Sequence, residues 1–156
     1  MKISDFLKKE NIIIDLKART KEKAFEEIIN NAKFSQDKKK LIFLSLMQRE
    51  VLGTTGIGNG IAIPHARSVV LNKLHLHVGV SAKGIEYDAM DGKPVHLVFL
   101  IMAPPLDTSN QYLILLGKVA ALSKKMIRKK SFLKLKTEDD FIKQIMEFEN
   151  NTEDDI

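Results

Sequence analysis

The chain has no cysteine or tryptophan, only four prolines, and 6% aromatic residues. The absence of cysteine excludes a disulfide framework, cysteine-type zinc sites and thiol nucleophiles, and it is compatible with a reducing compartment. The longest apolar stretch, LVFLIMAPPL at 97–106, is about half as long as a membrane-spanning helix and is interrupted by prolines. We therefore expect no direct insertion into a membrane.

The length of 156 residues, 44% of them hydrophobic, suits one globular domain with its own core. We expect this domain to cover residues 1–150 and an acidic tail to fray at 151–156. The first residues, MKISDFLKKENIII, include charges from the second position onward, so they lack the apolar core of a secretory signal. The expected location is the cytoplasm.

Basic residues outnumber acidic ones by 25 to 20, which gives a formal net charge of +5. Lysines and arginines cluster at 38–40 and at 124–130. A nucleic-acid-binding surface needs basic residues interleaved with aromatics, or a recognised motif, and neither is found. Net charge alone concerns association and not function. We therefore expect no nucleic-acid partner.

Apolar residues recur at helical spacing in several segments. Thr20 and Thr137 precede two of these segments and are typical N-cap residues. The expected helices lie at about 3–7, 21–32, 38–51, 109–124 and 138–148. The apolar residues expected to pack in the core on the third and fourth helices are Leu41, Leu44 and Met47 or their neighbours, and Leu113, Leu116 and Ala120.

Short β-branched and apolar runs between these helices predict strands. Segments 12–14 and 61–63 indicate short buried strands, and the alternation at 74–80 indicates a half-buried strand. Segment 95–102 is almost continuously apolar, as expected of a central strand covered on both faces. Helices interleaved with strands favour an α/β layer architecture.

The segment REVLGTTGIGNGIAIPHAR at 49–67 carries most of the chemical information. Four glycines in eight residues permit unusual backbone dihedrals and can form an anion-binding nest. Gly58, Asn59 and Gly60 are the candidates for such a nest, and Asn59 can equally serve as a left-handed turn residue. The segment has neither the Walker pattern nor the dinucleotide-binding glycine spacing.

His65 is the candidate nucleophile, because a neutral imidazole can carry a covalent group. Arg49 and Arg67 flank it in sequence and can form charge-assisted hydrogen bonds to a phosphoryl group. From the residues alone, a histidine that only satisfies the end of a strand, beside glycines that only form turns, explains the pattern equally well.

TTGIGNGIAIPHA closely resembles the active-site signature of the phosphotransferase-system IIA domains of the mannitol/fructose class, which includes the nitrogen-regulatory IIA proteins. The arginine–glutamate pair before it and DGKPVHLVFLIMAP after it also fit. The resemblance implies a single α/β domain with a mixed β-sheet flanked by helices on both faces. It also implies a phosphotransferase that uses no cofactor or metal.

In that family, the histidine that corresponds to His65 accepts a phosphoryl group on Nε2 from HPr and passes it to a cysteine of a IIB domain. The resemblance assigns Arg49 to orienting or neutralising that group. Family members usually carry a second histidine at the start of the helix after the proline loop, and Tyr112 occupies that place here. A tyrosine hydroxyl can donate a hydrogen bond to phosphate but cannot become cationic.

Tyr112, Asn59, Gly58 and Gly60 are therefore the further expected phosphate-stabilising residues, with Arg67 and Thr55 as additional candidates. Two alternatives stay open. One is a nitrogen-regulatory protein whose phosphorylation state controls binding to a regulatory partner, and the other is a non-catalytic binding module on the same fold. Around His65 we expect exposed apolar residues where the donor docks, with Ile57 as a candidate.

Three further groups of residues receive structural interpretations. His75 and His77 are two residues apart on a strand, and without a third ligand they indicate an exposed strand face and no metal site. His96 is expected to be structural and close to the pocket. Asp88 and Asp91 flank a turn, where aspartate favours local backbone hydrogen bonds.

Overall fold

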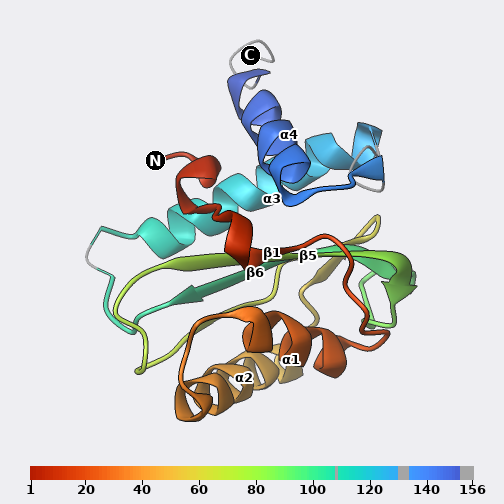
Figure 1. Ribbon diagram of the computed structural model, residues 1–156. Helices are drawn as coiled ribbons and strands as arrows, with labels where there is room; N and C mark the ends of the chain where they lie inside the picture. Colours follow the sequence, from red (N-terminus) through yellow and green to blue (C-terminus); the bar gives the residue numbers. More distant parts are fainter. Residues whose placement is uncertain (108, 130–133, 152–156) are drawn as a thin grey trace.

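The computed structural model describes residues 1–107, 109–129 (backbone only for 127–129) and 134–151, in which one mixed sheet lies between two layers of helices (Figure 1). The layers confirm the expected fold class. The predicted acidic tail at 151–156 falls outside the described residues, apart from Asn151.

Six strands within the described residues form the sheet, in the order β1-β5-β6-β3-β2, and β4 also pairs with β6. The β5–β6 and β2–β3 pairs are antiparallel, whereas β1–β5, β3–β6 and β4–β6 are parallel. The long strand β6 is therefore the centre of the sheet. The strands are β1 (Ile12–Ile13), β2 (Gly56–Gly58), β3 (Ile61–Ala62), β4 (His65–Arg67), β5 (His75–Ile85) and β6 (Val95–Ala103).

The helices cover both faces of this sheet, with α1 and α2 on one face and α3, α4 and the N-terminal turn on the other (Figure 1). Thr20 and Thr137 cap α1 and α4, each accepting a hydrogen bond from the backbone N–H three residues onward, as predicted. The helical elements are η1 (Ile3–Phe6), η2 (Lys9–Asn11), α1 (Lys21–Asn31), α2 (Gln36–Val51), α3 (Gln111–Lys129) and α4 (Glu138–Asn150). No helix in the described ranges has the length and apolar character that a bilayer span requires.

The core consists of two apolar clusters, one on each face of the sheet. Strand β6 contributes to both, with Leu97 and Phe99 in one cluster and Val98 and Leu100 in the other. The prediction of a central strand covered on both faces is thus confirmed. The prediction that 74–80 is only half-buried is wrong, because helices cover both faces of β5 and leave His77 only 2% exposed.

On α2 and α3, the face that is buried against the sheet differs from the face predicted from sequence. Leu41 and Leu44 are exposed, and Met47 is partly buried against the core as predicted. The fully buried apolar residues of α2 are the neighbouring Ile42 and Leu46. Leu113 is likewise exposed, and Leu116 and Ala120 are only partly buried. The buried face of α3 consists of Tyr112, Leu115, Val119, Leu122 and Met126. Both helices contain a nearly continuous apolar run, at 41–47 in α2 and at 112–116 in α3, so helical spacing alone fits more than one face.

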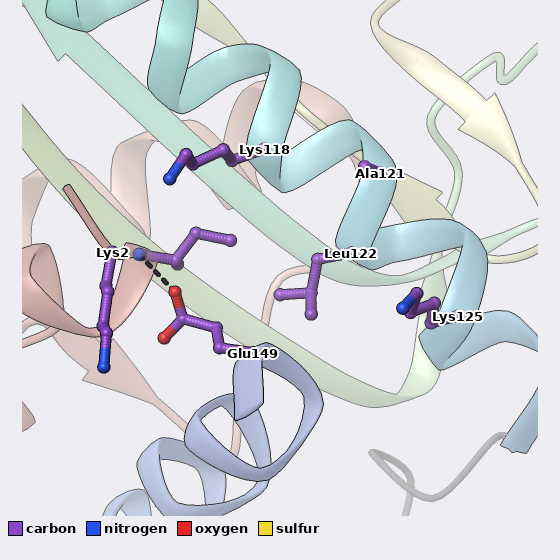
Figure 2. Close-up of a pocket in the computed structure, with 7 residues that line it drawn as sticks. Lys2, Lys118, Ala121, Leu122, Lys125 and Glu149 are labelled. Carbon is purple, nitrogen blue, oxygen red and sulfur yellow. Dashed lines mark hydrogen bonds between the residues drawn. The ribbon is translucent and has the colours of Figure 1, made fainter. Parts of the chain in front are cut away.

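The N-terminal turn is attached to the end of α4 by Glu149, whose carboxylate accepts hydrogen bonds from the backbone N–H groups of Ile3 (2.6 Å) and Ser4 (3.1 Å). Beside this contact lies a pocket of about 380 Å³ between η1, α3 and α4, into which Lys118 and Leu122 project (Figure 2). Its lining includes lysines and one carboxylate but no histidine, serine or threonine. The candidate nucleophile lies elsewhere.

Candidate functional site

His65 is the first residue of β4 and lies opposite Ile101 of β6 in the parallel pairing. The backbone N–H of Ile101 donates to the carbonyl of Pro64 at 2.9 Å, which fixes the chain just before the histidine. The half-buried ring borders a cavity of about 440 Å³. α2 contributes Arg49 to this cavity, β4 contributes His65 and Arg67, and α3 contributes Tyr112 and Leu113.

The His65 ring presents a defined nitrogen to this cavity. Its Nδ1 lies 2.8 Å from the carbonyl oxygen of Ile63. Because a carbonyl can only accept, Nδ1 carries the hydrogen. Burial lowers the pKa of His65, the hydrogen bond to Ile63 opposes that effect, and the positive charge of Arg49 adds to the lowering. The neutral ring at pH 7 therefore has its free electron pair on Nε2.

Two guanidinium groups supply positive charge to the cavity. Arg49, in the last turn of α2, donates through Nη1 to the carbonyl of Gly53 at 2.9 Å. Arg67 donates to the carbonyls of Pro104 and Pro105, both at 3.3 Å. Neither guanidinium forms a salt bridge within the described residues, although backbone hydrogen bonds and, less strongly, the positive charge of Arg67 lower the pKa of Asp107. The structure thus brings both predicted arginines into the cavity of His65.

Tyr112, in the first turn of α3, also lines the cavity. Its ring centroid is 6.1 Å from that of His65, and the guanidinium carbon of Arg67 lies 4.6 Å from the tyrosine ring centroid. Burial raises the pKa of Tyr112, although the charges of Arg67 and Arg49 oppose the rise. The hydroxyl is therefore neutral at physiological pH. Asp107 fixes the start of the helix by accepting from the Tyr112 N–H at 2.7 Å.

The glycine turn at Gly58, Asn59 and Gly60 does not reach this cavity. All three residues have positive φ, which fits the tight connection between β2 and β3, and the Asn59 N–H donates to Asp91 at 2.9 Å. Ile61 pairs with Leu97 whereas His65 pairs with Ile101. Four residues of strand span about 13 Å. These three residues therefore lie outside the cavity of His65, and their contact with a phosphoryl group stays a prediction.

Thr55 is also placed away from the cavity. It is 4% exposed, and its hydroxyl donates to Glu50 and lies 2.6 Å from the hydroxyl of Tyr87. The ammonium group of Lys21 completes this cluster, 2.9 Å from Glu50 Oε2 and 4.6 Å from the Tyr87 ring centroid. Burial and the nearby Glu50 charge raise the pKa of Tyr87. In the sequence, Glu50 is distinguished only by following Arg49, and no motif indicates this buried network.

The other singled-out histidines lie outside the cavity. His77 is buried, and neither of its ring nitrogens has a hydrogen-bond partner in the part of the chain that the structure describes. The expected exposed face for His75 and His77 is therefore wrong, because the α1–α2 connection at Phe34 covers both rings. His96 Nδ1 donates a hydrogen bond to the carbonyl of Ser81 at 2.8 Å, as a structural residue does.

The two aspartates near the predicted turn also have local roles. Asp88 has a φ of 62°, and Asp91 accepts from the N–H groups of Asn59 and Lys93. Asp91 therefore makes the local backbone hydrogen bonds predicted for it. No group of three or more potential metal-ligating side chains occurs among residues 1–107, 109–129 and 134–151.

Two leucines at the rim of the cavity are open to solvent. Leu52 after α2 is 83% exposed and Leu113 on α3 is 56% exposed, and both line the cavity. Ile57 is 38% exposed but belongs to β2 and does not line it. A histidine nucleophile, two guanidinium groups and a neutral hydroxyl beside two exposed leucines can bind and carry an anionic group.

Comparison with known proteins assigns a family to this arrangement. Residues 5–148 match the family described as "Phosphoenolpyruvate-dependent sugar phosphotransferase system, EIIA 2". A nitrogen regulatory protein of Bradyrhizobium diazoefficiens is 36% identical over 123 residues, which is 78% of this chain and 80% of that protein. The fructose-specific EIIA component of Haloferax volcanii is 34% identical over 130 residues, covering 82% and 84% of the two chains.

A solved structure agrees with these sequence relatives. The nitrogen regulatory protein IIA-Ntr of Neisseria meningitidis superimposes with a TM-score of 0.81 at 26% identity. The superposition covers 92% of this chain and 98% of the other.

Proposed function

Since the chain belongs to the EIIA 2 family of the phosphoenolpyruvate-dependent sugar phosphotransferase system, we propose that it is a phosphoryl carrier that accepts its group from HPr on Nε2 of His65. The observation that carries the proposal is the hydrogen bond between His65 Nδ1 and the Ile63 carbonyl. It leaves Nε2 as the free nucleophile at the edge of a cavity with two guanidinium groups.

The transfer is a displacement at phosphorus. Nε2 of His65 forms a bond to the phosphorus atom while the bond from phosphorus to the donor nitrogen breaks, and the donor ring leaves with that electron pair. The phosphorylated ring keeps its hydrogen on Nδ1 and becomes positively charged. The Ile63 carbonyl, which accepts that hydrogen at 2.8 Å, stabilises the charge.

The remaining side chains of the cavity act on the transferring oxygens. Arg49 and Arg67 neutralise charge on the phosphoryl group, and the Tyr112 hydroxyl donates a hydrogen bond to it. Such a transfer depends mainly on positioning and charge stabilisation. Arg67 is held on the Tyr112 ring, so this pair supplies a permanent cation where the family usually has a titratable histidine.

Leu52 and Leu113, which are exposed and line the same cavity as His65, give the donor an apolar surface. Interface centres are depleted of charged residues, and these two exposed leucines meet that requirement. For the next step, we propose transfer to the cysteine of a IIB domain, in line with the fructose-specific name of the Haloferax volcanii relative.

A second candidate is control of a regulatory partner by phosphorylation. The relatives from Bradyrhizobium diazoefficiens and Neisseria meningitidis are both named nitrogen regulatory proteins, and the replacement of the usual second histidine by Tyr112 favours a site specialised away from onward transfer. Both candidates share the phosphohistidine. They differ in whether a IIB cysteine discharges it.

The test is incubation with HPr, enzyme I and phosphoenolpyruvate, followed by intact-mass measurement under alkaline conditions that preserve phosphohistidine. We expect the chain to gain one phosphoryl group and His65→Ala to gain none. His75→Gln is the matched control, because it removes a half-buried histidine outside the cavity, and it should be modified like the natural chain. Absence of modification, with retained binding to HPr, supports a non-catalytic binding module instead.

A further inference from the structure

We infer that Glu50 is a positioning residue for this site: through Thr55 and Ile63, its buried carboxylate holds His65 in the orientation that leaves Nε2 free. Glu50 lies in the last turn of α2, directly after Arg49, and is 9% exposed. The inference rests on the proposed function for the use of Nε2. The contacts that support it belong to the unphosphorylated chain.

The Glu50 carboxylate collects donors from three different parts of the fold. Oε2 accepts from Lys21 Nζ of α1 at 2.9 Å and from the Thr55 N–H at 3.2 Å. Oε1 accepts from the hydroxyls of Thr55 and Tyr87, the latter at 3.3 Å. A buried carboxylate is stable only when it is paired and hydrogen-bonded. These four donors therefore fix Thr55 relative to α1 and to the end of β5.

Thr55 transmits this constraint to the catalytic histidine. Its N–H points to Glu50, and its carbonyl accepts from the Ile63 N–H at 2.9 Å. The carbonyl of Ile63 then accepts from His65 Nδ1 at 2.8 Å. Ile63 is 3% exposed, so water has little access to replace either hydrogen bond. The proline between Ile63 and His65 further limits the backbone.

The same residue constrains Arg49. The backbone carbonyl of Glu50 accepts from the Gly53 N–H at 3.1 Å, and the Gly53 carbonyl accepts from Arg49 Nη1 at 2.9 Å. Glu50 thus holds the segment that follows it in two ways, with its backbone carbonyl bonded to Gly53 and its carboxylate bonded to Thr55. The network thus fixes the position of His65 relative to Arg49, although Glu50 itself does not line the cavity.

Glu50→Gln is the informative variant, because it keeps the size of the side chain but places an NH₂ group among hydrogen-bond donors. We expect the Nδ1–H tautomer of unphosphorylated His65 to lose its dominance, as read from ¹⁵N chemical shifts of the labelled ring. Loss of an outer hydrogen-bond partner of a metal-bound histidine typically costs about 10- to 100-fold in activity, and we expect an effect at the lower end of this range for a histidine held through backbone groups. The expected result is a fall of about tenfold or more in the kcat of phosphoryl acceptance, with an unchanged KM for HPr.

The matched control is Glu22→Gln, which changes an exposed glutamate in the first turn of α1. It should leave both readouts unchanged. Tyr87→Phe is the second variant, because it removes one hydroxyl of the network and keeps the ring that packs edge-on against Phe25 at 6.0 Å. It should move the tautomer and kcat in the same direction by a smaller amount, and it decides the question if Glu50→Gln does not fold.

Three results separate the possible outcomes. An unchanged His65 tautomer and rate in both folded variants, or in Tyr87→Phe alone if Glu50→Gln is unfolded, overturns the positioning role. A loss of stability with an unchanged tautomer also overturns it and leaves Glu50 as a structural residue. A shifted tautomer in a chain that accepts no phosphoryl group supports the positioning role and removes the proposed function.

Discussion

His77 gives the protein a specific sensitivity to acid. The ring is 2% exposed in β5, and neither nitrogen has a hydrogen-bond partner within the described ranges. Burial lowers the pKa of His77 from 6.5 to about 4, and the charges of His75 and Lys8 add to the effect. The perturbation is His77→Leu, which replaces the ring by an apolar group of similar volume and removes the titration.

The sign and size of the effect follow from proton linkage. Below pH 6.5 the unfolded chain binds a proton at His77, whereas the folded chain binds it only below about pH 4. Protonation of His77 therefore does not reduce the free energy of unfolding above pH 6.5, but it reduces this free energy increasingly as the pH falls toward 4. A separation of about 2.5 pH units corresponds to about 3 kcal/mol lost at pH 4 through this residue.

The assay is urea unfolding of both chains at intervals between pH 7.5 and pH 4. His77→Leu should be within about 1.5 kcal/mol of the natural chain at pH 7, because no hydrogen bond is lost. Its stability should then exceed that of the natural chain increasingly as the pH falls, by about 3 kcal/mol at pH 4. His75→Leu, at a half-buried ring, should show a smaller difference. Parallel stability curves for His77→Leu and the natural chain refute the reasoning.

Two further predictions concern the cavity. Arg49→Gln should lower the rate of phosphoryl acceptance about 10²- to 10³-fold in rapid-quench measurements, because it removes a cation that lines the cavity and that the proposed function assigns to the transferring group. Arg19→Gln, which removes an arginine that also donates to a backbone carbonyl, is the control, and equal rates for the two variants contradict the role of Arg49. Tyr112→His should make phosphoryl acceptance relative to the natural chain increase as the pH falls below about 6.5, where the new imidazole becomes cationic. A rate ratio that does not change with pH excludes Tyr112 from contact with the phosphoryl group.

The elements predicted correctly from sequence are those for which a single local feature, such as a long apolar run or a capping residue, determines the structure. The apolar run at 95–102, interrupted only by His96, is typical of a strand or helix buried on all sides, and its length favoured the strand that became β6. Thr20 and Thr137 were sufficient to place the starts of α1 and α4, because a side-chain cap is a local interaction. The faces of α2 and α3 were not predictable in the same way. Their apolar runs are wider than the buried stripe, and only packing against the sheet selects Ile42 over Leu41.

The candidate site shows the same division. His65, Arg49, Arg67 and Tyr112 were identified from sequence and share one cavity. The position of the glycine turn could not be predicted in this way. The turn is close to His65 in sequence, but β3 follows it and pairs with β6 four residues before the point where His65 pairs.

The network of Lys21, Glu50, Thr55 and Tyr87 was missed for a related reason. Its members are far apart in sequence, from α1 to the end of β5, and only the tertiary fold brings them together. A glutamate next to an arginine at the end of a helix gives no sign in sequence that its side chain is buried.

The central claim is that Nε2 of His65 forms the bond to phosphorus. The most direct measurement is a ¹H–¹⁵N spectrum of the phosphorylated chain with labelled histidine rings, in which coupling to phosphorus identifies the bonded nitrogen. We predict coupling at Nε2 of His65, with the hydrogen retained on Nδ1. Phosphorus bonded to Nδ1 of His65, or to any other residue, would contradict the account.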